Sequence, residues 1–164
     1  MFETAFGIPA HPLLVHVPVV FVPLLILVTL AYGLLPRWRS RLDWAVVALA
    51  VATPIGCYVT RASGLAFRSR LIRHKSVSDQ DLAKINAHQS FGTMTLLLSC
   101  ALGLVALALV AVTVLRARRS GTAGNGFGPV VLVLVVLAFV ASAVTGYYVF
   151  KTGDSGAHIV WQGR

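Results

Sequence analysis

Residues 95–115 read TLLLSCALGLVALALVAVTVL, an apolar run without a single charged side chain. About twenty such residues are enough to cross the ~30 Å hydrocarbon core of a bilayer as an α-helix. Three comparable runs lie elsewhere in the chain, and short segments rich in arginine separate them. The sequence therefore predicts a polytopic membrane protein.

The composition of the whole chain agrees with this class. Of its 164 residues, 57% are hydrophobic and only 12% are charged, whereas soluble domains carry about 25% charged residues. This balance excludes a disordered chain, a secreted disulfide scaffold and a soluble enzyme. The formal net charge of +9 comes almost entirely from residues between the apolar runs, so we expect anionic lipid headgroups, and no nucleic acid, as the counter-charge. Cys57 and Cys100 lie inside apolar runs and are expected as buried small hydrophobic residues.

We expect one domain, residues 1–164, with transmembrane helices at about 12–35, 42–62, 88–115 and 129–150. Because lipid cannot satisfy exposed backbone polar groups, spans of this length are helices rather than barrel strands. Segment 63–87 is then an extramembrane loop, in which Ser78 is the N-cap of the third helix. Four crossings predict an all-α four-helix bundle with both termini on the same side of the membrane. Residues 153–156 predict a tight turn after the last span.

Small and weakly polar residues repeat at helical spacing in three of the spans. Such stripes let transmembrane helices approach closely, and packing alone is sufficient to explain them. We expect them on the inner faces of the bundle. They are Ala48, Ala52, Gly56 and Thr60 in the second span, His88, Gly92, Thr95, Ser99 and Gly103 in the third, and Ala138, Ser142, Thr145 and Gly146 in the fourth.

All five histidines, His11, His16, His74, His88 and His158, fall on one expected face of the membrane. His16 lies about 6 Å along the first helix at 1.5 Å per residue, and His88 lies at the mouth of the third. These two side chains are therefore expected at similar depth on different helices. Two neutral imidazoles in such positions can bind one metal ion, or both axial positions of a haem iron.

Other polar residues on that face are placed to support such a centre. His11 and His158 are further candidate ligands, Asp154 is placed to orient His158, and Arg61 is placed to pair with a haem propionate. The alternative for each histidine is a surface side chain that hydrogen-bonds to water or a lipid headgroup. That alternative is favoured for His74, which lies between two basic residues.

Three motifs carry a family resemblance: HPLLVHVP at residues 11–18, His88 with Gly92 one turn later, and GDSGAHIVW at residues 153–161. Together they resemble bacterial membrane proteins of domain of unknown function family 2231, over essentially the whole chain. The resemblance implies a four-helix membrane domain with histidines gathered at one surface, and haem binding. It makes His16 and His88 the first candidate ligands, supported by His11 and the closing motif. Some members carry a histidine where this chain has Asp154, so a second ligand pair would here be either lost or shifted to His158.

The leading hypothesis is a membrane protein similar to b-type cytochromes. It would hold haem b, or alternatively copper or zinc, through His16 and His88 between the first and third helices. Because the candidate ligands lie on one face, such a centre would exchange electrons with a quinone in the lipid or with a redox partner protein at that surface. No catalytic motif is present, so the sequence does not establish an enzyme.

Two rival hypotheses remain at the level of the sequence. One is a non-catalytic accessory subunit of a larger membrane complex, which the small-residue stripes motivate. The other is a proton or metal transporter that uses the histidines as relays, which is least favoured because no histidine lies near the other face. The oligomeric state is left open.

The charges around the first span favour an N-terminus outside the cell. No Lys or Arg precedes this span, and Arg37, Arg39 and Arg41 follow it, as expected for a loop on the cytoplasmic side. The basic residues within 63–87 oppose this orientation. We expect a multi-pass protein of the bacterial plasma membrane with its termini outside.

Overall fold

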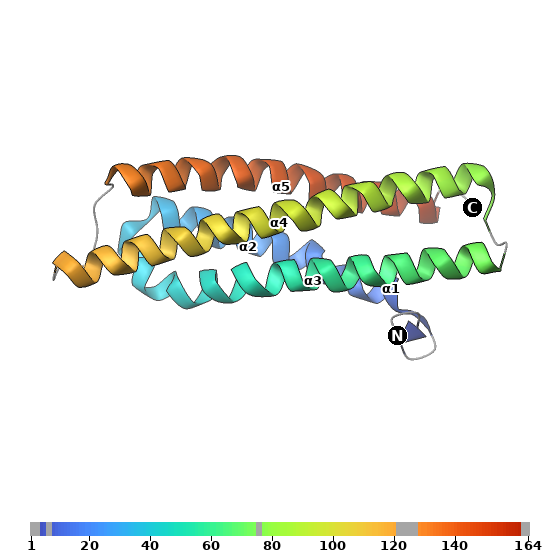
Figure 1. Cartoon of the computed structure of the whole chain (residues 1–164), viewed down its shortest axis with the longest axis horizontal. Helices are drawn as coiled ribbons and strands as arrows, with labels where there is room; N and C mark the ends of the chain where they lie inside the picture. Colours follow the sequence, from blue (N-terminus) through green and yellow to red (C-terminus); the bar gives the residue numbers. More distant parts are fainter. Residues whose placement is uncertain (1–3, 6–7, 75–76, 121–127, 162–164) are drawn as a thin grey trace.

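The protein is an elongated bundle of long helices in a computed structural model that describes residues 4–5, 8–74, 77–120 and 128–161 (Figure 1). The first apolar run is divided at Val15 into α1 (Ala10–Leu14) and α2 (His16–Leu34). The 3-10 helix η1 (Pro36–Trp38) leads into α3 (Arg39–Arg73), and α4 (Asp79–Ser120) and α5 (Pro129–Trp161) complete the bundle. A short antiparallel pair, β1 (Thr4–Ala5) and β2 (Ile8–Pro9), precedes α1.

The expected four-helix membrane fold is confirmed. In the part of the chain that the structure describes, four segments are long and apolar enough to cross a membrane: Ala10–Leu34, Pro36–Arg73, Asp79–Arg119 and Pro129–Trp161. Helix α1, the end of α3, the start of α4 and the end of α5 share one end of the bundle, so both termini lie on the same side (Figure 1). We call this the histidine end, and the other, at the α2–α3 connection, the opposite end.

Helices α3 and α4 are longer than the expected spans. Their 35 and 42 residues correspond to about 52 and 63 Å, well beyond the ~30 Å of hydrocarbon that a span must cross. Segment 63–87, expected as a loop, is therefore helical over 63–73 and 79–87. The predicted cap is confirmed, because the Ser78 hydroxyl accepts a hydrogen bond from the backbone N–H of Asp81 at 3.2 Å.

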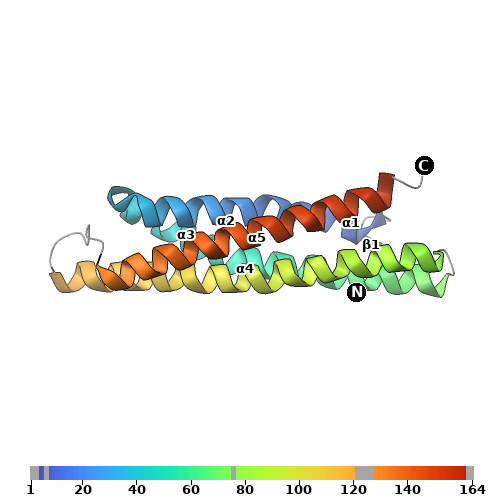
Figure 2. The ribbon, with the colours of Figure 1, turned by 90° about the horizontal axis from the view of Figure 1, so that it is seen from above.

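The tight turn expected at 153–156 is wrong, because α5 continues through these residues to Trp161. Two side-chain interactions are compatible with the helix there. The Ser155 hydroxyl donates to the carbonyl of Thr152 at 3.0 Å, and Asp154 lies 3.3 Å from His158, one turn further on. Figure 2 shows α5 running obliquely across the bundle, where it packs on both α4 and α2.

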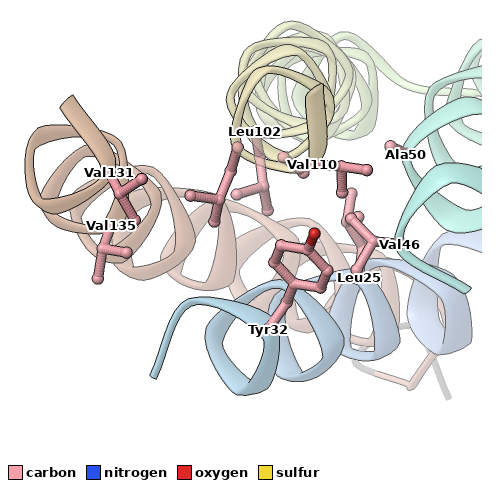
Figure 3. Close-up of a cluster of buried hydrophobic side chains, with 10 residues drawn as sticks. Leu25, Tyr32, Val46, Ala50, Leu102, Val110, Val131 and Val135 are labelled. Carbon is pink, nitrogen blue, oxygen red and sulfur yellow. The ribbon is translucent and has the colours of Figure 1, made fainter. Parts of the chain in front are cut away.

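The core lies where the four long helices meet, around Leu25, Tyr32, Leu102 and Val135 (Figure 3). The stripes predicted for the third and fourth spans do face inward. In the second span, Thr60 is buried and Ala52 and Gly56 are half-buried, as predicted, whereas Ala48 is exposed. Besides Thr60, α3 buries Val46, Ala50, Thr53, Cys57 and Ser63, and Arg39 at its start.

The rotation of α3 follows from its contact with α4. A Cβ added to Gly103 would lie 2.7 Å from the carbonyl oxygen of Ala50, so the two backbones are in close contact at this point. Only glycine permits that approach, and it turns the Ala50 side of α3 toward the core. Cys57 is buried, as expected, Cys100 is partly buried, and both are free thiols.

Candidate functional site: a histidine pair at one end of the bundle

Two histidines meet at the histidine end. The ring centroids of His11 on α1 and His88 on α4 are 6.2 Å apart, with ring planes at 75°. Both side chains are half-buried. The structure therefore joins an imidazole of the first crossing to one of the third, as the sequence predicts, but with His11 in place of His16.

The His11 ring is oriented by α3. Its Nδ1 atom lies 3.2 Å from the carbonyl oxygen of Thr60 and 3.1 Å from the hydroxyl of Ser63. A carbonyl oxygen only accepts, and the Ser63 hydroxyl donates its own proton to Thr60 at 2.7 Å. Nδ1 must therefore carry the proton, which leaves the lone pair of the neutral ring on Nε2.

The His88 ring is oriented in the same way by α5. Its Nδ1 atom lies 2.9 Å from the hydroxyl oxygen of Ser155. The Ser155 hydroxyl also lies 3.0 Å from the carbonyl of Thr152, to which it can donate, so its oxygen can accept from Nδ1 of His88. In that tautomer both rings hold an Nδ1 proton against the protein and carry an Nε2 lone pair, which is the arrangement that orients metal-binding histidines.

A glycine on a neighbouring helix makes room for each ring. A Cβ at Gly64 of α3 would lie 3.0 Å from Cε1 of His11, and a Cβ at Gly156 of α5 would lie 3.0 Å from Cε1 of His88. Any larger residue at either position would push against a ring edge. Ser63–Gly64 and Ser155–Gly156 therefore form matching pairs, in which the serine holds a ring and the glycine accommodates it.

The other sequence-predicted residues lie apart from this pair. His16 is exposed, and its Nδ1 lies 3.1 Å from the carbonyl of Leu13 in the preceding turn. The expected pairing of His16 with His88 is therefore not formed, because His11, and not His16, contacts Ser63 of α3 and His88 of α4. Arg61 donates from Nε to the hydroxyl of Thr93 on α4 at 3.0 Å.

His158 and His74 are both exposed. His158 lies 3.3 Å from Asp154, so these two side chains do orient each other as expected. His74 follows the last residue of α3. The residues that sequence reasoning missed are Ser63, Gly64 and the polar group at the opposite end, Tyr32 with Asp43. The helical periodicity of small residues continues past Thr60, and this signal pointed to Ser63 and Gly64.

The donor set fits a transition-metal centre with two protein ligands. Imidazole nitrogen suits iron, copper and zinc. Across the described ranges, no group of three or more His, Cys, Asp or Glu side chains is placed to hold an ion, so the remaining ligands would come from elsewhere. Two surface hollows of about 330 and 290 Å³ lie at this end, and neither is bordered by His11 or His88.

These features define a multi-pass membrane protein with a histidine pair at one end of a four-helix bundle. The family model described as "Predicted membrane protein (DUF2231)" matches residues 7–164. The chain therefore belongs to the DUF2231 family. No curated protein and no solved structure matches it.

Proposed function

We propose that this protein holds a transition-metal centre between His11 and His88 at one face of the membrane. One observation carries the proposal: two imidazoles from separate helices each hold Nδ1 against protein oxygens, which leaves both Nε2 atoms available to a metal. Such second contacts fix ring orientation and raise ligand basicity. Ser63 and Ser155 are the positioning residues of this centre.

Haem iron and a single copper or zinc ion share this ligand chemistry. Two histidines complete the axial ligation of a haem, which would supply one-electron transfer, whereas a bound ion would need further ligands from water or a partner. The centre would lie at the surface of the bundle end, so electron exchange with a membrane quinone or a surface partner is the activity that it supports.

We infer that the histidine end faces the outside of a bacterial plasma membrane. The opposite end carries two groups of arginines close to the spans, in η1 and the start of α3 and at the end of α4, which are Arg37, Arg39, Arg41, Arg116, Arg118 and Arg119. The basic residues of segment 63–87 at the histidine end oppose this orientation. Basic residues close to the ends of spans favour the cytoplasmic side. The four long apolar helices indicate contact with lipid in either orientation.

The test is the metal and haem content of detergent-purified protein from cells supplied with haem, iron, copper and zinc. We expect His11→Ala and His88→Ala each to abolish binding. His16→Ala is the matched control, because His16 is an exposed histidine at the same end, and it should retain full content. Circular dichroism checks that each variant is folded.

The absorption spectrum and the metal analysis together identify which metal centre is bound. A Soret band that both variants lose supports haem, and copper or zinc without a Soret band supports a single ion. Colourless, metal-free wild-type protein overturns the proposal and favours the accessory-subunit hypothesis. If His16→Ala loses its metal or haem and His11→Ala keeps it, the ligands are His16 and His88, as expected from the sequence. That result would refute the pairing of His11 with His88.

A further inference from the structure

A second polar group lies at the opposite end of the bundle. The Tyr32 hydroxyl donates to Oδ1 of Asp43 at 2.7 Å and lies 2.6 Å from the hydroxyl of Thr113. Tyr32 and Thr113 are buried, and Asp43 is half-buried. Asp43 lies one residue inside the expected second span, and an ionisable side chain at the edge of a membrane span is a functional candidate by default.

Between this group and the histidine end, two buried hydroxyls have no partner. Thr29 on α2 is 0% exposed and Ser142 on α5 is 4% exposed, and neither side-chain oxygen has a hydrogen-bond partner within the described part of the chain. Most buried polar atoms are satisfied, and an exception commonly marks the place of an ordered water.

The register of α2 against α5 places these two hydroxyls at the same level. Gly33 packs against Val135, and Gly146 packs against Ile26, so the helices run antiparallel. Thr29 lies three residues from Ile26, and Ser142 lies four residues from Gly146, which correspond to about 4.5 and 6 Å along the two helix axes. Thr29 and Ser142 therefore both lie between the Gly33–Val135 contact and the Gly146–Ile26 contact. Thr29 is also one turn from Tyr32 on α2.

Further hydroxyls continue toward the histidine end. Thr145 is one turn beyond Ser142 on α5, and its hydroxyl lies 3.4 Å from the carbonyl of Leu98 on α4, the residue before Ser99. Thr95 is one turn further along α4 and hydrogen-bonds to Thr152 at 2.9 Å. Ser155, beside His88, is the next residue of this series on α5.

We propose that these side chains form a proton path across the membrane, from Asp43 at the opposite end to Ser155 at the histidine end. We call this path the hydroxyl column. Its residues are Asp43, Tyr32, Thr29, Ser142, Thr145, Ser99, Thr95, Thr152 and Ser155. Neighbours one turn apart on a helix have Cβ atoms about 5–6 Å from each other, a gap that one water molecule bridges. The proposal does not depend on a metal at the histidine pair.

Each step conserves protons and bonds. A water or hydroxyl accepts a proton on an oxygen lone pair and releases the proton that it already carried to the next oxygen, so it ends neutral. At the opposite end Tyr32 passes its phenolic proton to the Asp43 carboxylate and takes one from the neighbouring water or hydroxyl. Asp43 then releases its proton to the adjacent aqueous phase, while Ser155 at the histidine end takes one from the water on that side, so the net change is one proton moved toward the opposite end.

The experiment measures proton flux into liposomes that contain the purified protein and a trapped pH-sensitive dye, driven by a potassium diffusion potential. Thr29→Val removes the hydroxyl with little change in shape, and we expect it to slow the flux about tenfold or more, as a barrier raised at one step would. Thr29→Ser keeps the hydroxyl and should keep the flux. Ser142→Ala is a second, independent loss variant.

Thr53→Val is the matched control. Thr53 is also fully buried, but its hydroxyl donates to the carbonyl of Phe21 at 3.4 Å and lies outside the hydroxyl column. Wild-type flux no faster than that of protein-free liposomes overturns the proposal. The proposal is also overturned if Thr29→Val and Ser142→Ala conduct protons as fast as wild type. It is overturned as well if Thr29→Ser loses as much flux as Thr29→Val. Flux that falls only in the two loss variants supports it.

Discussion

Gly156 shows how much the histidine pair depends on single residues. It lies on α5 directly after Ser155, whose hydroxyl lies 2.9 Å from Nδ1 of His88. A methyl group at Gly156 would lie 3.0 Å from the His88 ring, closer than most carbon contacts in proteins. The same helix carries Gly153, where an added Cβ would meet nothing within 4 Å. These two glycines therefore separate the effect of ring contact from that of helix propensity.

We predict that Gly156→Ala lowers the affinity of the histidine pair for its metal centre about tenfold, equivalent to about 1.4 kcal/mol. The physical reason is that the ring must shift and its hydrogen bond to Ser155 lengthens. Gly153→Ala should leave the affinity unchanged and stabilise the helix by about 0.5–1 kcal/mol. Titration of the metal-free protein measures the affinity, and thermal unfolding measures stability. Equal affinities in both variants would contradict the proposed role of Gly156.

A side chain from α3 caps the C-terminus of α2, which lies at the opposite end of the bundle. A helix terminus leaves its last carbonyl groups without partners inside the helix. Arg39, only 6% exposed, donates from Nε to the carbonyl of Tyr32 at 3.1 Å and from Nη2 to that of Gly33 at 3.2 Å. Its guanidinium also lies 5.9 Å from the centre of the Tyr32 ring. One side chain at the start of α3 thus connects the two helices of the first hairpin.

We predict that Arg39→Ala destabilises the protein by about 2–3 kcal/mol, because hydrogen bonds to charged groups and buried carbonyls left without a donor each contribute on this order. Arg41→Ala is the control. Arg41 lies in the same segment but is exposed, and its loss should change stability by no more than about 0.5 kcal/mol. Chemical unfolding in detergent, followed by circular dichroism, measures both. Equal stabilities would show that Arg39 does not cap α2.

The length of α3 and α4 extends the bundle beyond the lipid at the histidine end. The polar segments 63–73 and 79–87 continue these helices past their apolar parts. A metal centre at His11 and His88 would therefore lie near the membrane surface, with helical walls above it, and not at the centre of the bilayer. Such a position is accessible to a partner protein and to the headgroup region of the lipid.

We predict that a cysteine at Ser78 reacts with a membrane-impermeant maleimide added to intact cells, because the histidine end faces outside. A cysteine at Arg118, which is exposed at the opposite end, should react only after the cells are opened. Cys57 is buried and Cys100 partly buried within the bundle, so both should add little background. Labelling with the reverse pattern would invert the orientation and leave the fold unchanged.

The sequence predicted which end of the bundle holds the candidate site, but not which side chains contact each other there. The sequence predicted five histidines at one end, and the structure places His88 there beside a second imidazole. The sequence paired His88 with His16 from their similar depth on two helices. The packing of α1 on α3 gives that position to His11. The oxygens that orient both rings come from helices distant in sequence.

The sequence by itself determined the number of crossings, the shared side of the termini and the cap at Ser78. Each of these is a local property, since the apolar length of a run and the hydrogen bonds of one turn depend only on neighbouring residues. The tertiary structure alone decided which side of α3 is buried, which histidines meet, and that Tyr32 reaches Asp43 and Thr113. These depend on how each helix is rotated about its axis, and that rotation is set by contacts such as Gly103 against Ala50.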